Sequence, residues 1–150
     1  MKLTLLLLKI TTISWFLFWI LIFYLKFVPL TVFELTKPLF VPSPVKSGET
    51  VTYIEDYCKY IGNKGTVVHA LQKKLTDKEK AQGIADISYV FDPLKDVNVP
   101  TGCHSFSVNI VAPESLEKGR EYRVFKTIHI RVNIVRTVDL EFYSNWFKVI

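Results

Sequence analysis

Hydrophobic and polar residues follow two different patterns along this chain. The first thirty residues form a nearly unbroken apolar run with no charge between Ile10 and Leu25. From residue 48 onward, apolar and polar residues instead alternate in short segments bounded by Gly, Pro, Asn or Asp. The long apolar run predicts a membrane-spanning helix, and alternation with a period of two predicts half-buried β-strands.

The apolar run is long enough to cross a hydrocarbon core of about 30 Å, and only a helix can satisfy the backbone of a single segment there. Three lysines flank or interrupt it: Lys2, Lys9 and Lys26. Because Lys2, Lys9 and the amino terminus outnumber Lys26, the positive-inside rule predicts a cytoplasmic N-terminus and an extracytoplasmic (periplasmic or extracellular) C-terminal domain.

A cleaved secretory signal is the competing interpretation, since Lys2 precedes a leucine-rich stretch. Cleavage requires small residues just beyond the apolar run. No alanine precedes Ala70, however, and no glycine precedes Gly48. We therefore predict that residues 1–30 form an uncleaved signal-anchor helix.

The rest of the chain has the length of one domain. Residues 31–47 include a proline-rich stretch, Lys37–Val45, which predicts either an extended stalk or a first edge strand. Residues 48–150 are predicted to form a single extracytoplasmic β-domain.

Seven strands are predicted in all, and together they indicate an all-β sandwich. The clearest alternation lies in Ser105–Ile110, Tyr122–Val132 and Val138–Phe142. Weaker candidates are Phe33–Thr36, Glu49–Tyr60, Thr66–Leu71 and Ile84–Phe91. A bulge or turn is expected at Ser144–Asn145, where the alternation changes phase. One helical turn is expected at Thr76–Ala81, because Thr76 and Glu79 have capping-box spacing.

The connection before residue 122 carries a more specific signal. Gly119 permits a positive φ, and Tyr122 enters the next strand with a hydroxyl able to bond back to the loop. This resembles the crossover loop and tyrosine corner of immunoglobulin-like and fibronectin-like sandwiches. The Cys, Trp, Cys pattern of immunoglobulin domains is absent.

Two cysteines, Cys58 and Cys103, fall in separate predicted strands. Outside the cytoplasm they can pair, and closing a loop of about 45 residues would contribute roughly 3 to 4 kcal/mol. If the orientation is inverted, they are two unpaired small residues instead.

Candidate chemistry is sparse. His69, His104 and His129 fall on separate predicted strands without metal-ligand spacing, so they are expected to be ordinary surface or edge histidines. No catalytic motif or cofactor signature is present, and we expect neither enzyme activity nor a cofactor. The net charge of +5 is not concentrated in a patch, which argues against nucleic-acid binding.

The segment Asp56–Tyr60, Gly102-Cys103 and the stretch from Val111 to Tyr122 together resemble a pattern in small single-pass membrane proteins of phages and environmental bacteria. The resemblance implies such an origin and supplies no function.

Three functional hypotheses follow. The first is a non-enzymatic interaction or structural module at a cell envelope, with the lipid bilayer and a protein or envelope component as partners. The alternative is a structural membrane protein of a virion or a phage envelope-disrupting protein, and an enzyme around His104 ranks below both. The oligomeric state and the ligand stay open at this stage.

Overall fold

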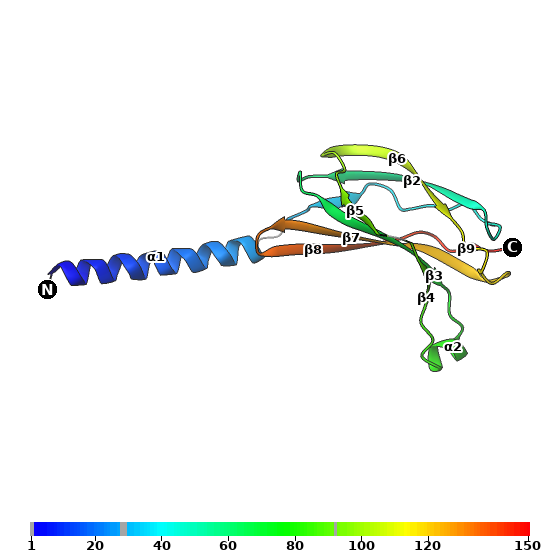
Figure 1. Ribbon diagram of the computed structural model, residues 1–150, viewed down its shortest axis with the longest axis horizontal. Coiled ribbons are helices and arrows are strands. Elements are labelled where there is room, and N and C mark those ends of the chain that lie inside the picture. The colour runs from blue at the N-terminus through cyan, green and yellow to red at the C-terminus, as the bar shows by residue number, and fades with distance from the viewer. Residues whose placement is uncertain (1, 28–29, 92) are drawn as a thin grey trace.

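An N-terminal helix leads into a β-domain in the computed structural model (Figure 1). The structure describes residues 2–27, 30–91 and 93–150, without the side chains of residues 2–7, 95 and 96. The helices are α1 (Lys2–Phe27) and α2 (Asp77–Ala81). The strands are β1 (Phe33–Leu35), β2 (Thr50–Lys59), β3 (Gly65–Lys73), β4 (Ile87–Val90), β5 (Leu94–Val97), β6 (Gly102–Val111), β7 (Glu121–Asn133), β8 (Arg136–Tyr143) and β9 (Phe147–Lys148).

No described side chain of helix α1 is buried, and the helix projects from one end of the domain (Figure 1). The segment Leu8–Phe27 has a mean hydropathy of 1.8 over 20 residues, so it is long and apolar enough to span a bilayer. Lys9 and Lys26 lie near the two ends of this segment. The side chain of Lys2, and residues 1, 28 and 29 of the predicted anchor, lie outside the described part of the chain.

The β-domain consists of two antiparallel sheets in a sandwich-like arrangement. The smaller sheet has the order β1-β2-β6, and the larger has the order β4-β3-β7-β8, with β5 also paired to β3 and β9 to β7. Strand β5 was not predicted, because its four residues contain two charges and show no alternation. The two-residue strand β9 is also additional to the seven predicted strands, all of which are present with shifted ends.

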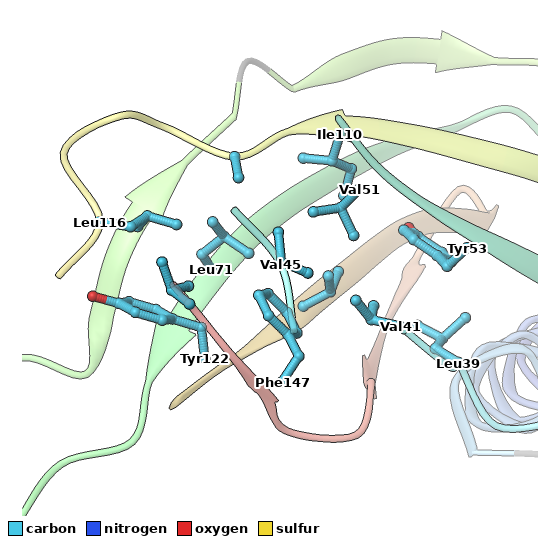
Figure 2. Close-up of a cluster of buried hydrophobic side chains, with 13 residues drawn as sticks. Leu39, Val41, Val45, Val51, Tyr53, Leu71, Ile110, Leu116, Tyr122 and Phe147 are labelled. Atoms are coloured by element: carbon cyan, nitrogen blue, oxygen red, sulfur yellow. The ribbon is translucent and has the colours of Figure 1, made fainter. Parts of the chain in front are cut away.

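A hydrophobic cluster fills part of the interior between the two sheets (Figure 2). It brings together inward positions of both sheets and is formed by Leu39, Val41, Val45, Val51, Tyr53, Leu71, Ile110, Ala112, Leu116, Tyr122, Val124, Phe147 and Val149. We call these residues the apolar half of the interior. Burying this much apolar surface provides the main driving force for folding.

The proline-rich stretch is part of this core and is not a free stalk. Leu39, Val41 and Val45 are buried in it. The amide side chain of Asn145 receives a hydrogen bond from Val41 N at 2.7 Å and donates one to Val41 O at 2.9 Å. Leu39 and Val45 also form β-bridges with Ser144 and Val149, so the proline-rich stretch packs against the sandwich.

The loop before β7 adopts the geometry expected of it. Gly119 has a φ of 80°, and the Tyr122 hydroxyl accepts a hydrogen bond from Glu117 N at 3.1 Å. The tyrosine thereby ties its strand back to the preceding loop.

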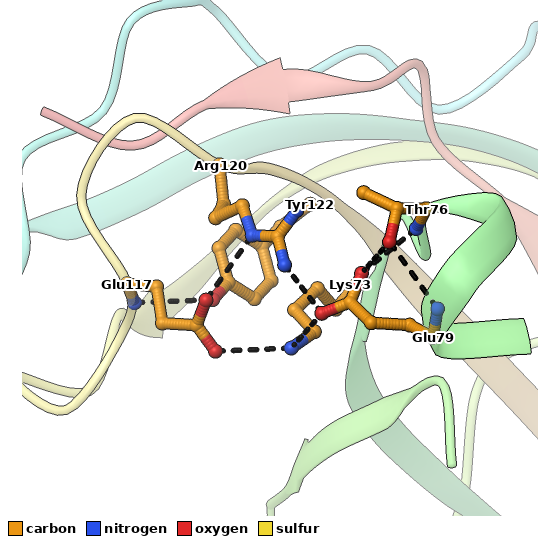
Figure 3. Close-up of polar contacts among 6 residues, drawn as sticks. All are labelled: Lys73, Thr76, Glu79, Glu117, Arg120 and Tyr122. Atoms are coloured by element: carbon orange, nitrogen blue, oxygen red, sulfur yellow. Dashed lines mark hydrogen bonds and ion pairs between the residues drawn. The ribbon is translucent and has the colours of Figure 1, made fainter. Parts of the chain in front are cut away.

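The predicted helical turn is α2, and it has the predicted capping box between Thr76 and Glu79. Glu79 also pairs with Lys73 at 3.2 Å and with Arg120, and Glu117 bridges the same two cations (Figure 3). Hydrogen bonds from Thr76 lower the pKa of Glu79 to about 2. This network ties α2 to the loop before β7.

Candidate functional site

A cavity of about 260 Å³ lies between the two sheets, beside the apolar half. Most of its wall is apolar and comes from Phe33, Val67, Leu94, Val97, Val99, Phe106, Val108, Ile128 and Ile130. Four ionisable side chains also line it: Glu55, Lys59, His69 and Lys126. We call these four the polar half of the interior.

Glu55 and Lys126 form an ion pair that joins the two sheets across the interior. Each occupies an inward position of its strand, and only 1% of Glu55 and 3% of Lys126 are exposed. Burial lowers the pKa of Lys126, and the Glu55 carboxylate opposes that shift. Removing two charges from water costs several kcal/mol for each, so this pair is a weak source of stability.

The second carboxylate oxygen of Glu55, Oε2, has no hydrogen-bond partner among the described residues. A buried acceptor without a donor typically costs about 1 to 3 kcal/mol. Glu55 also lines the cavity, so its carboxylate lies beside the space that a ligand would occupy.

His69 stands beside this pair, since it is the register partner of Lys126 on the neighbouring strand β3. It is only 8% exposed, and its Nε2 also lacks a partner within the described structure. Burial, with a contribution from the Lys126 charge, lowers its pKa to about 4, so the ring is neutral at pH 7.

The prediction of an ordinary surface histidine is therefore wrong for His69. It shares the inward face of β3 with Val67 and Leu71, and this alternation was the signal in the sequence that could have located it. The inward orientation of Glu55 was predictable in the same way, because Val51 and Tyr53 share its face of β2.

Lys59 closes one end of the cavity. Its ammonium group donates to Asn63 O at 2.7 Å and to Val99 O at 2.8 Å. Burial lowers its pKa. Because two carbonyl oxygens already hold this cation, it does not depend on a carboxylate partner.

Leu94 and Phe106 lie where the cavity meets solvent, since both line it and both remain exposed. They belong to β5 and to β6, and β6 is an edge strand of the smaller sheet. The cavity thus opens between an edge of each sheet, where a molecule can enter without separating paired strands.

The cavity end near Lys59 lies on the same side of the domain as α1. Asn63 donates to Arg131 O and Val132 O, both at 2.7 Å, and the adjacent Asn133 donates from its side chain to Leu25 O at 3.0 Å. That last contact satisfies a carbonyl that the helix end would otherwise leave unpaired. The tip of the β7–β8 hairpin therefore lies against the end of the membrane-span candidate.

The hairpin tip is itself apolar. Ile134 and Val135 form it, and Ile134 is 78% exposed. Exposed aliphatic groups next to the end of an apolar helix lie where a bilayer surface would be if α1 spans a membrane.

The two cysteines and the other two histidines do not line this cavity. Cys58 and Cys103 are directly opposite on β2 and β6, at disulfide-bonding distance within one sheet. His104 Nε2 lies 2.9 Å from Thr101 O, and His129 Nδ1 lies 2.7 Å from Asp139 Oδ1. No three His, Cys, Asp or Glu side chains in the described ranges are grouped to hold a metal ion.

No protein-family model matches this sequence, and no curated protein matches it.

Proposed function

We propose that the chain is a membrane-anchored, non-enzymatic binding module, with its β-domain on the extracytoplasmic side of a cell envelope. The observation that carries the proposal is the open cavity between the sheets, with an ion pair and unsatisfied polar atoms inside an apolar wall. A concave apolar site with a few convergent polar groups is the usual form of a small-molecule site.

Binding is favoured over catalysis by the state of the polar groups. The Glu55 carboxylate is paired with an ammonium group, and His69 Nε2 has no carboxylate to orient it and no nucleophile to activate among the described residues. Nucleophilic catalysis typically places a base within hydrogen-bond reach of a nucleophile and of a third group that orients the base. The cavity groups are instead arranged to recognise a polar group on a bound molecule.

The placement of the domain supports an anchored role. The contact between Asn133 and the helix end, together with the apolar hairpin tip, is compatible with a domain that lies on the membrane surface. Within this proposal the domain belongs to the immunoglobulin-like class, which the bond between Tyr122 and the preceding loop supports.

Orientation is tested by labelling Cys58 and Cys103 in intact cells with a membrane-impermeant thiol reagent. We expect labelling only after reduction, because an extracytoplasmic pair would be oxidised. Labelling that requires permeabilised cells would place the domain in the cytoplasm and contradict the proposal.

Binding is tested by native mass spectrometry of the full chain released from gently solubilised membranes. We expect a bound small molecule on the wild-type protein and none on Val67→Phe, in which the new ring would occupy the cavity. Recovery of the same adduct on both proteins would contradict a role for the cavity.

A further inference from the structure

The size of the cavity sets the size of what it can hold. An engineered apolar cavity of about 150 Å³ accommodates benzene, which has six non-hydrogen atoms. Scaled to the 260 Å³ of this cavity, the same ratio gives a molecule of about ten non-hydrogen atoms. The apolar wall requires most of those atoms to be carbon.

The charges around the cavity determine the polar group of that molecule. A ligand cation would enter beside two buried ammonium groups, Lys59 and Lys126. A ligand anion would lie beside the Glu55 carboxylate, while Lys126 is already paired with that carboxylate and Lys59 is already held by two carbonyl oxygens. An additional charge would also have to lose its hydration in an apolar enclosure. An uncharged ligand avoids each of these penalties.

The unpartnered atoms determine which uncharged group fits. Oε2 of Glu55 can only accept a hydrogen bond, so the ligand must donate one. A hydroxyl donates one hydrogen bond and also accepts, which leaves it able to receive a bond from His69 Nε2 in the tautomer that carries the proton there. Hydrogen bonds to charged groups are among the stronger ones.

We propose that the cavity binds an uncharged, mostly apolar alcohol of about ten non-hydrogen atoms, whose hydroxyl donates to Glu55 Oε2. This inference rests on the proposed function, since it specifies the ligand class of the same cavity.

The test uses the full chain in lipid nanodiscs and four probes that share a phenylpropyl group. These are 3-phenylpropan-1-ol, propylbenzene, 3-phenylpropanoate and 3-phenylpropylammonium, titrated by calorimetry against empty nanodiscs as the blank. We expect the alcohol to bind at least about tenfold more tightly than each of the other three. The Val67→Phe variant should show no binding above the blank.

A double variant, Glu55→Leu with Lys126→Met, separates recognition of the hydroxyl from the presence of a cavity. It removes both charges together, which is often neutral for stability, and it keeps the apolar wall. We expect it to bind propylbenzene at least as well as the wild type does and to lose the preference for the alcohol.

The outcomes distinguish a failure of the alcohol assignment from a failure of the proposed binding function. If the alcohol and propylbenzene bind equally, or if the carboxylate or the ammonium probe binds best, the hydroxyl assignment is overturned and the binding cavity stands. If no probe binds the wild-type protein, the cavity holds water only, and the proposed function fails with the assignment.

A competition experiment tests whether the alcohol comes from the bilayer or from solution. If 1-nonanol, a membrane-partitioning alcohol of about the same size, is incorporated in the nanodisc and displaces 3-phenylpropan-1-ol from the wild-type protein, the ligand is drawn from the bilayer. If it does not, the cavity takes a dissolved alcohol.

Discussion

The apolar half and the polar half of the interior occupy equivalent inward positions on the same strands. On β7, Tyr122 and Val124 belong to the first and Lys126 to the second. The apolar half is closed by the proline-rich stretch and by β9 (Figure 2). The polar half lines the cavity, holds the buried ion pair and has two atoms without a partner in the described structure, Glu55 Oε2 and His69 Nε2. The Tyr53 hydroxyl of the apolar half is also without a partner among the described residues.

The difference between the halves separates stability from function. Close-packed apolar side chains lower the free energy of the folded state, whereas buried charges and unfilled space raise it. Costly groups gathered at one place in a fold are typical of a binding site. We therefore expect substitutions in the two halves to have different consequences.

The largest effect is expected in the apolar half. Phe147 is fully buried there, so Phe147→Ala should lower the free energy of unfolding by about 4 kcal/mol. The measurement is denaturant unfolding of the full chain in detergent. Phe40→Ala is the matched control, because Phe40 is exposed, and it should change stability by less than about 0.5 kcal/mol. Equal losses in the two variants would contradict the assignment of the core.

The second effect tests the ion pair. Lys126→Met leaves the Glu55 carboxylate buried without its cation, which should cost about 3 kcal/mol in unfolding free energy. The double variant Glu55→Leu, Lys126→Met should return to within about 1 kcal/mol of the wild type. If the double variant is as unstable as the single one, the pair itself holds the two sheets together and the comparison between the halves is wrong.

The third effect concerns pH. The pKa of His69 is lowered from 6.5 to about 4 in the folded state, so between these values the unfolded chain binds more protons than the folded one. The contribution of His69 to the unfolding free energy is therefore fully present above pH 6.5. It decreases by about 3 kcal/mol as the pH falls toward 4. His69→Gln should show a correspondingly smaller loss between pH 7 and pH 4 in the same unfolding assay. Parallel pH profiles would show that His69 is not buried as described.

The smallest effect compares two valines. Val67 lines the cavity and Val41 lies in the closed cluster. Val67→Phe has space for its ring and should change the unfolding free energy by less than about 1 kcal/mol, whereas Val41→Phe should cost about 1 to 3 kcal/mol through overpacking. Similar losses of unfolding free energy in the two variants would mean that the cavity has no room for the new ring.

The elements of this fold were largely predictable, because each follows from local patterns. Alternation located most strands, and the spacing of Thr76 and Glu79 located α2. Strand β5 was missed because its pairing with β3 is not reflected in its own four residues. The interpretation of Lys37–Val45 as a stalk was wrong, because these residues pack into the core. A proline-rich composition indicates an extended segment but does not indicate what the segment packs against.

The candidate site was not predicted, although its residues were visible. Glu55 and Lys126 each interrupt the inward apolar face of a predicted strand, but they are 71 positions apart. Nothing local indicates that the two strands belong to different sheets and face each other. His69 was assigned to the surface on the basis of its residue type, when its position on β3 predicted an inward side chain.

The sequence by itself determined the apolar N-terminal helix, the β-class of the domain and which residues of each strand share a face. These properties depend on hydropathy and on the two-residue period of a strand, which act over a few positions. The tertiary structure alone decided which faces meet, that Glu55 pairs with Lys126, and that the cavity lies beside them. Those properties depend on how the two sheets are packed, and packing is fixed by contacts between residues far apart in the chain.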